Sequence, residues 1–203
     1  MAEHRGIEWG LTTKCRHGEA TSGDLAAVAI LPEGALVAGI DGLGHGIEAA
    51  RAAAVAAAIV RQSQTQDLEL LVERCHRSLR GTRGAAISLA FVSCVDSTIT
   101  WLGVGNVEGR VLSADPVARG PKGSLPLARG VPGHELPPMR TATLELQTGD
   151  VLLLATDGIA AAFADALDIS GSIQAISDRI VADHWKRSDD ALVLAVRYLG
   201  ARP

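Results

Sequence analysis

The sequence predicts an α+β fold of hairpin-connected antiparallel sheets covered by helices. Three observations indicate this class. Strand-like apolar runs follow one another across short turns, helical segments come in pairs, and 47% of the 203 residues are hydrophobic. A chain of this length and composition can bury a sizeable core. Because no repeat or composition shift marks a boundary, we expect one domain over residues 1–203.

The N-terminal part of the chain is expected to form strands. Residues 6–14 are predicted as a first strand at the edge of a sheet. The apolar runs 25–31 and 35–40 flank the turn-forming sequence Pro-Glu-Gly at 32–34. That spacing predicts an antiparallel hairpin.

Two helices are predicted next. Residues 47–64 are rich in alanine, which has the highest intrinsic helix propensity. A second helix is expected over 67–80, where apolar residues recur at helical spacing behind Asp67, a favourable N-cap. Gly81 can end that helix. The short connection between the two segments predicts an antiparallel helical pair.

The middle of the chain returns to β-structure. The apolar runs 85–95 and 98–104 are predicted as a second hairpin, and residues 110–112 as a short strand after a glycine-containing turn at 105–109. Residues 115–139 contain several prolines and glycines and show no periodicity. A loop of that length in a compact domain usually has a function or conceals short strands.

The C-terminal part is predicted to alternate strands and helices. Strands are expected at 141–146, at 151–155 and at 191–198, and the last two are continuous apolar runs typical of buried strands. Helices are expected near 160–167 and over 172–186.

Acidic residues mark the ends of several predicted strands. They follow a strand at Asp41 and Asp157, and they precede one at Asp24 and at the pair Asp189-Asp190. Because antiparallel strands alternate in direction, all these positions can meet at one rim of a sheet. Crowded carboxylates repel each other unless a cation neutralises them. Oxygen ligands favour Mg²⁺ or Mn²⁺ over zinc, and two such ions support phosphoryl chemistry.

Each of these residues also has a plainer interpretation. Asp-Gly after a strand usually marks only a turn, and His45 alone is more often a turn residue than a catalyst. The glycine-rich segment 42–46 could instead hold a phosphate at a helix N-terminus. It lacks the spacing of the known phosphate loops, however, and Asp41 would repel an anion in the absence of a metal.

Composition excludes several functional classes. The net charge of −4 gives no basic surface for nucleic acid. Three widely spaced cysteines form neither a zinc pattern nor a disulfide framework, which favours a reducing compartment. No apolar signal core follows the N-terminus, and the alanine-rich stretch 49–60 is too short to span a bilayer. We therefore expect a cytoplasmic protein without membrane or nucleic-acid partners.

Several motifs occur in a characteristic order. These are Ser-Gly-Asp at 22–24, Asp-Gly-Leu-Gly-His-Gly at 41–46, Gly-Asn at 105–106, Thr-Gly-Asp-Val-Leu-Leu-Leu-Ala-Thr-Asp-Gly-Ile at 148–159 and Asp-Asp-Ala-Leu-Val-Leu at 189–194. Together they resemble the metal-dependent protein phosphatases of the PPM family, and more narrowly the bacterial SpoIIE/RsbU/RsbX branch. The resemblance implies two packed antiparallel sheets flanked by helical pairs, an αββα sandwich. It also implies hydrolysis of phosphoserine and phosphothreonine in proteins with manganese or magnesium.

The resemblance implies a role for each matched acid. Asp41 would bridge two ions, and the backbone carbonyl of Gly42 would bind one of them. Asp157 and Asp189 would hold the other ion, and Asp24 would act directly or through water. Asp41 and Asp157 are thus the expected catalytic residues.

Four further positions have less definite roles. Asp190 is kept as a second candidate beside Asp189, because two adjacent aspartates leave open which of them matches the acid of the family motif. Asn106 is expected to shape the site, and Gly44 and His45 belong to the metal loop. Many eukaryotic relatives have histidine directly after Asp-Gly as a general acid, but this chain has Leu43 there. That role therefore does not transfer to His45, and solvent is expected to protonate the leaving group.

The expected substrates rest on the resemblance alone. Relatives of the RsbU and SpoIIE types usually carry further segments before the phosphatase domain, and here almost nothing precedes the first strand. We therefore expect the stand-alone RsbX type, which acts on phosphorylated STAS-domain proteins of the stressosome, RsbR-like and RsbS-like, and resets stress signalling. The alternatives are an RsbU/SpoIIE-type phosphatase acting on an anti-anti-sigma factor and a non-catalytic phosphoprotein-binding module. A nucleotide-binding α/β protein would require a parallel sheet, which the predicted hairpins disfavour.

Overall fold

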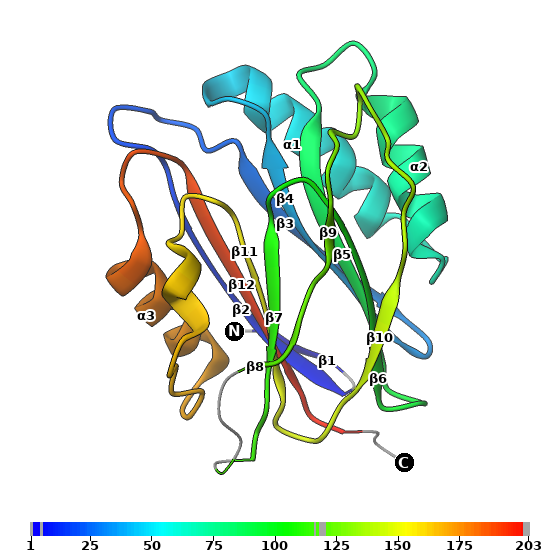
Figure 1. Ribbon diagram of the computed structural model, residues 1–203, viewed down its shortest axis with the longest axis vertical. Helices are drawn as coiled ribbons and strands as arrows, with labels where there is room; N and C mark the ends of the chain where they lie inside the picture. Colours follow the sequence, from blue (N-terminus) through cyan, green and yellow to red (C-terminus); the bar gives the residue numbers. More distant parts are fainter. Residues whose placement is uncertain (1, 5, 116, 118–120, 201–203) are drawn as a thin grey trace.

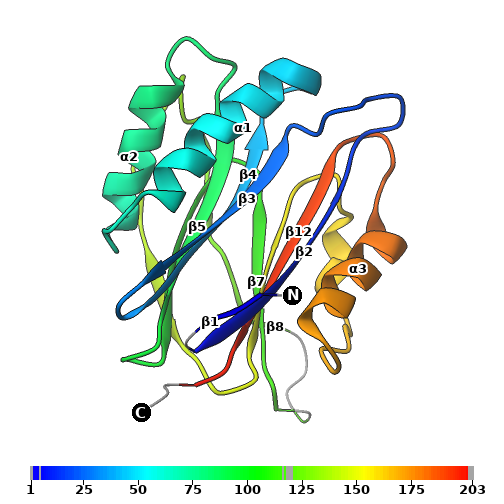
Figure 2. The same ribbon diagram turned by 180° about the vertical axis from the view of Figure 1, so that it is seen from behind.

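A computed structural model describes residues 2–4, 6–115, 117 and 121–200 and shows two β-sheets packed face to face. Helices α1 and α2 cover the outer face of one sheet, and α3 covers the other (Figure 1). This arrangement is the predicted αββα sandwich. The view from behind shows the same layers, with β2 running beside α3 (Figure 2).

Each sheet is defined by its strand order. The first has the order β1-β2-β12-β11-β7-β8 and the second the order β10-β6-β5-β4-β3, with β9 paired to β6. The strands are β1 (Ala2–His4), β2 (Ile7–Lys14), β3 (Asp24–Leu31), β4 (Gly34–Gly42), β5 (Ala85–Ser93), β6 (Thr98–Val104), β7 (Glu108–Leu112), β8 (Pro121–Ser124), β9 (Leu127–Ala128), β10 (Ala142–Glu145), β11 (Val151–Ala155) and β12 (Ala191–Tyr198). The helices are α1 (Gly46–Arg61), α2 (Leu68–Leu79), α3 (Ile173–His184) and the short 3₁₀-helix η1 (Ala161–Ala164).

The predicted hairpins are confirmed. β3 pairs antiparallel with β4, β4 with β5, and β5 with β6, so the acidic ends of β3 and β4 share one rim. Among the described residues the only parallel pairing between strands joins β6 to the two-residue strand β9. The antiparallel ladders disfavour the nucleotide-binding alternative, which requires a parallel sheet.

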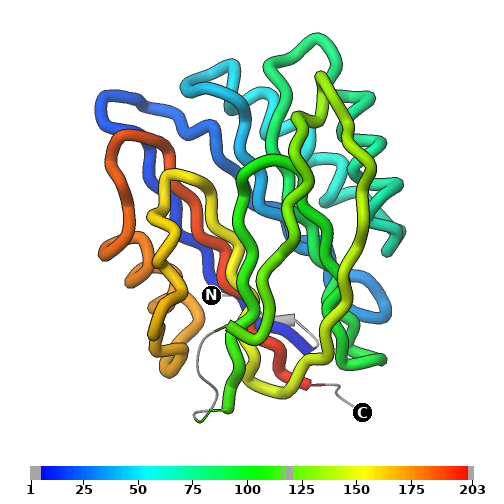
Figure 3. Tube along the Cα trace, in the orientation of Figure 1, coloured from blue at the N-terminus to red at the C-terminus, as the bar shows by residue number. Residues whose placement is uncertain are grey.

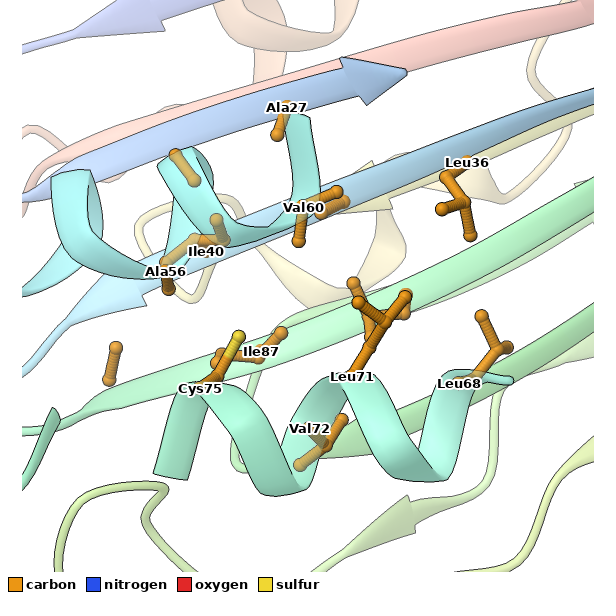
Figure 4. Close-up of a cluster of buried hydrophobic side chains, with 14 of the residues drawn as sticks. Ala27, Leu36, Ile40, Ala56, Val60, Leu68, Leu71, Val72, Cys75 and Ile87 are labelled. Atoms are coloured by element: carbon orange, nitrogen blue, oxygen red, sulfur yellow. The ribbon is translucent and has the colours of Figure 1, made fainter. Parts of the chain in front are cut away.

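Helices α1 and α2 pack on the second sheet through different kinds of side chain. The buried face of α1 is formed mainly by alanines, among them Ala52 and Ala56, so its backbone lies close to β3 and β4. α2 buries a larger stripe that includes Leu71 and Cys75, and the Asp67 side chain caps it by accepting from Leu70 N (2.9 Å). Figure 4 shows Ala56 of α1 and Leu71 and Cys75 of α2 between the helices and the sheet. Burying one leucine contributes about 1.5–3 kcal/mol, so this interface anchors the α1–α2 pair.

Two polar side chains cover sheet edges. On β2, the Gln174 amide donates to Leu11 O (3.1 Å) and accepts from Leu11 N (3.2 Å), as a neighbouring strand would. On β3, the Arg61 guanidinium donates to Ala26 O (2.6 Å). These contacts satisfy backbone groups that an open edge leaves unpaired.

Two expectations about single elements were wrong. The strand predicted at 6–14 is not an edge strand along its whole length, because β1 pairs with its first residues. The helix predicted near 160–167 is only η1, four residues long. No side chain caps it at Ala160, and Ala166 adopts a left-handed conformation (φ 52°) that an α-helix cannot continue through.

The long segment 115–139 was expected either to have a function or to conceal short strands, and the structure shows short strands in it. It contains β8 and β9 and then runs beside α2 (Figure 3). There Gly133 N donates to His76 Nδ1 (3.1 Å), and the His134 ring is hydrogen-bonded to Arg83 O (3.0 Å). The segment is therefore attached both to α2 and to the loop that follows it.

Candidate metal centre

The loops that carry the predicted acids lie together at one end of the sandwich. Segments 15–23, 42–46, 156–160 and 186–190 all meet at the upper end of Figure 3. These loops connect to strands of both sheets, and the ends of those strands lie at the same side of the molecule. The site therefore spans the junction between the sheets.

Asp24, which is buried, and Asp41, which is half-buried, form the centre of this cluster. They are directly opposite each other in the β3–β4 ladder. Burial and then repulsion by Asp41 raise the pKa of Asp24 to about 8, although a hydrogen bond from Thr156 opposes the shift. Burial and then repulsion by Asp157 raise the pKa of Asp41 to about 7. Both pKa values are thus raised first by burial and then by the neighbouring carboxylates.

Asp157 follows β11 and is held from two sides. Its Oδ2 atom accepts from Asn106 Nδ2 (2.8 Å), and its backbone carbonyl accepts from Lys186 Nζ (2.6 Å). Asn106 also lowers the pKa of Asp41, so its amide lies between two of the acids. The side chain of Asp157 remains exposed to solvent.

The adjacent acids Asp189 and Asp190 have different surroundings. Both Asp190 oxygens are engaged by backbone groups, Oδ1 by Arg16 N and Oδ2 by Gly23 N, each at 2.7 Å. Asp189 is only half-buried, and its Oδ1 atom accepts from Asp190 N (2.9 Å). The charges of both Asp189 and Asp190 contribute to the raised pKa of Asp41. Asp190 therefore fastens the loop 15–23, whereas Asp189 is the more accessible carboxylate of the pair.

The loop after β4 depends on its glycines. A side chain at Gly42 would bring its Cβ within 2.1 Å of Ala49 O, so only glycine lets α1 approach. Gly44 has a φ of 89°, which favours glycine. The His45 ring is hydrogen-bonded to Glu19 Oε1 (2.8 Å).

Three residues of the site were not predicted. Thr156 Oγ1 donates to Asp24 Oδ2 (2.7 Å) and accepts from Leu192 N (2.8 Å). Lys186 and Glu19 act through the contacts described above. Thr156 could have been found as the polar residue that ends the apolar run of β11, but nothing in the sequence marks the other two.

The donor set fits a hard divalent cation. It consists of carboxylate and backbone oxygens, which Mg²⁺ and Mn²⁺ prefer. No three His, Cys, Asp or Glu side chains in the described part of the chain converge closely enough to enclose one ion by themselves. Mg²⁺ is commonly held by one or two carboxylates with several waters, and the raised pKa values of Asp24 and Asp41 indicate an excess of charge that a cation relieves.

Comparison with known families decides the classification. The model of the family "Stage II sporulation protein E (SpoIIE)" matches residues 32–199, which include β4, β11 and the acidic pair. The chain belongs to the SpoIIE family. It is thus a serine/threonine phosphatase of the metal-dependent type, as the motifs predicted.

Three relatives illustrate the similarity. The phosphoserine phosphatase RsbX of Bacillus subtilis (strain 168) is 26% identical over 151 residues, 74% of each chain. A chain in a structure described as "The bacterial stressosome: a modular system that has been adapted to control secondary messenger signaling" is 32% identical, with a TM-score of 0.85 over 94% of this chain and 99% of that one. A crystal structure of RsbX in complex with magnesium has a TM-score of 0.83 at 23% identity, covering 97% of this chain and 98% of that one.

Within the described ranges, no helix combines the length and the hydropathy needed to cross a bilayer.

Proposed function

We propose that this phosphatase removes phosphate from phosphoserine and phosphothreonine in STAS-domain proteins of a stressosome, with two Mn²⁺ or Mg²⁺ ions as cofactors. One observation carries the proposal. Asp24 and Asp41 oppose each other in register, and the charges of Asp157 and Asp189 help to raise the pKa of Asp41 to about 7. A stable fold holds so many carboxylates together when a cation is bound between them.

The surroundings of each acid support its assigned role. Asp41 lies at the centre of the mutual repulsion, which suits a carboxylate that bridges two ions, with the Gly42 carbonyl beside it. Asp157 and Asp189 would hold the second ion, since both approach Asp41 from the other sheet. Asp24 is buried, and Thr156 fixes one of its oxygens, which suits contact directly or through water. Asp190 has both oxygens occupied, so we assign the ligand role to Asp189.

When bound, two such ions activate a water molecule and stabilise the charge that develops on the phosphoryl group. The chain's own residues position the acids that hold them. Asn106 orients the Asp157 carboxylate, Thr156 orients that of Asp24, and Lys186 fixes the backbone carbonyl of Asp157. Leu43 offers no proton, so the leaving hydroxyl takes its proton from solvent.

The choice of substrate rests on the relatives. One is named as the phosphoserine phosphatase RsbX, and the 32%-identical structural relative belongs to a structure described as the bacterial stressosome. Both fit STAS-domain proteins of the RsbR and RsbS kinds as substrates.

The test is a phosphatase assay with purified proteins. Phosphorylated RsbS-like and RsbR-like proteins and a phosphorylated anti-anti-sigma factor are each incubated with the enzyme and Mn²⁺ or Mg²⁺. We expect release of phosphate from the stressosome proteins, and loss of that activity in Asp41→Asn and Asp157→Asn. Preference for the anti-anti-sigma factor would instead support the RsbU/SpoIIE-type alternative. Wild-type levels of hydrolysis in both variants would overturn the two-metal proposal.

Calorimetry separates an enzyme from a non-catalytic module. The wild-type protein should bind Mn²⁺ with measurable heat, and Asp41→Asn should not. A phosphoprotein-binding module without turnover has no need of the ions, so absence of binding at millimolar Mn²⁺ would favour that alternative.

A further inference from the structure

A groove lies between strand β2 and helix α3, outside the acidic cluster. Its volume is about 440 Å³, and its walls include Lys14 of β2, Val181 and Ala182 of α3, and Trp185 and Arg187 of the turn that follows. β2 and α3 run side by side along it (Figure 2). The part of its floor formed by Val181 and Trp185 is apolar, whereas Lys14 and Arg187 are exposed at its mouth.

The groove is directly connected to the catalytic acids. The indole Nε1 of Trp185, on one wall, donates to Asp189 O (3.0 Å). On the other wall, Lys14 is paired in register with Ala191, the residue that follows Asp190. A peptide lying in the groove would therefore continue into the acidic cluster within a few residues.

The charges of the groove favour an acidic occupant. The Arg187 guanidinium lies over the Trp185 ring, 5.9 Å from the ring centroid. The backbone of Arg187 is left-handed (φ 63°), which is unusual for a residue other than glycine. The one acid on the wall, Asp178, already accepts hydrogen bonds from Thr12 Oγ1 (2.6 Å) and Gln174 Nε2 (3.0 Å). The two cations at the mouth are therefore the groups available to an incoming ligand.

We propose that this groove binds the polypeptide segment on one side of the phosphorylated residue and selects substrates with acidic side chains there. The inference rests on the proposed phosphatase function, because it places the groove beside the phosphoryl site. An apolar floor with cations at the mouth suits an extended peptide that combines apolar and acidic residues. It also allows an acidic protein, of net charge −4, to attract an acidic substrate locally.

The test uses three synthetic phosphoserine peptides of equal length. One carries glutamates on one side of the phosphoserine, a second version carries them on the other side, and the reference peptide has glutamine in their place. The wild-type enzyme should hydrolyse one of the acidic peptides with a kcat/KM roughly tenfold above the reference, as expected for charge-assisted contacts. The double variant Lys14→Glu/Arg187→Glu should lose that preference.

A matched variant controls for the general change in charge. Arg74→Glu/Arg77→Glu makes the same change on exposed positions of α2, which covers the other sheet. It should keep the wild-type preference. The variant Arg187→Gly removes the guanidinium and the unfavourable φ together, so it should reduce the preference without lowering the melting temperature. An equal preference in the wild type and in Lys14→Glu/Arg187→Glu would overturn the proposal.

Binding is measured independently of turnover. Fluorescence anisotropy of labelled acidic and reference peptides is recorded with the Asp41→Asn protein, with and without the groove substitutions. The acidic peptide should bind preferentially, and Lys14→Glu/Arg187→Glu should abolish that preference. This result would support the groove even if no peptide were hydrolysed, and in that case only the proposed function would be refuted. Hydrolysis without any preference in binding or in kcat/KM leaves the function standing and refutes the groove.

Discussion

Asp24 and Asp41 face each other across the β3–β4 ladder, at the first residue of one strand and the penultimate residue of the other. Like charges directly opposite each other in a sheet are destabilising. In this protein Asp24 is also buried and Asp41 half-buried, which adds a desolvation penalty for the ionised forms. Either protonation or a bound cation would relieve this repulsion.

The first prediction concerns pH in the absence of metal. Both pKa values are raised from 3.8, to about 8 for Asp24 and about 7 for Asp41, so the folded chain holds protons that the unfolded chain has released. Their contribution to stability is complete below the unfolded pKa and disappears as pH rises through about 7 and about 8. With a chelator present, the free energy of unfolding should therefore increase when pH is lowered from about 9 to about 6.

Urea unfolding at several pH values measures this effect. The variant Asp24→Asn/Asp41→Asn serves as the control, because its amides cannot titrate. Its stability should depend less steeply on pH over the same range. If wild type and variant had the same pH dependence, the crowding of charge inferred from the ladder would be refuted.

The second prediction concerns metal addition. An ion that binds only the folded state stabilises it by about 2.7 kcal/mol at a free concentration 100 times its Kd. For a chain of this length, that corresponds to a rise in Tm of about 5–10 °C. Thermal unfolding with and without Mn²⁺ near pH 8 should show the increase in wild type and not in Asp41→Asn. Lowering the pH below about 7 should weaken metal binding, because protons compete for the same carboxylates.

The third prediction separates the two adjacent acids. Asp189→Asn should reduce metal affinity by more than about tenfold while leaving the metal-free protein as stable as before, since changes even to residues that only orient ligands cost 10–100-fold. Asp190→Asn should instead destabilise the metal-free protein by about 1–3 kcal/mol, because an amide oxygen and an NH₂ group cannot both accept from Arg16 N and Gly23 N. Calorimetric titration and urea unfolding of both variants distinguish the two roles. The reverse pattern would exchange the assignments of ligand and loop anchor.

The fourth prediction concerns the buried hydroxyl of Thr156. Thr156→Val keeps the shape but removes the donor to Asp24 and the acceptor for Leu192 N, so it should cost about 1–3 kcal/mol. The hydrogen bond from Thr156 lowers the pKa of Asp24, so its loss should raise that pKa further. The pH range over which the metal-free protein loses stability should therefore move to higher pH. Thr156→Ser retains the hydroxyl and should stay close to wild type in both measurements. Equal stability of the valine and serine variants would show that the hydroxyl is not needed.

Much of the fold was predictable because its signals are local. Apolar runs lie on both sides of the turn residues 32–34 and 96–97, so both hairpins could be predicted from the sequence. The Asp67 cap and the apolar stripe of α2 follow helical periodicity in the same way. The short helix η1 was mispredicted because Ala161–Ala164 has favourable propensity, whereas the left-handed turn at Ala166 depends on its surroundings.

The sequence by itself determined the types of element, the order of the motifs and the identity of the acids, because strand-end aspartates and glycines are visible as a pattern. Only the tertiary structure decided how these acids differ from one another. The burial of Asp24 under Thr156, the two backbone donors on Asp190 and the contact of Lys186 with Asp157 all join residues far apart in the chain. Hydrogen bonding and desolvation depend on those distant neighbours, and no local pattern of residues encodes them.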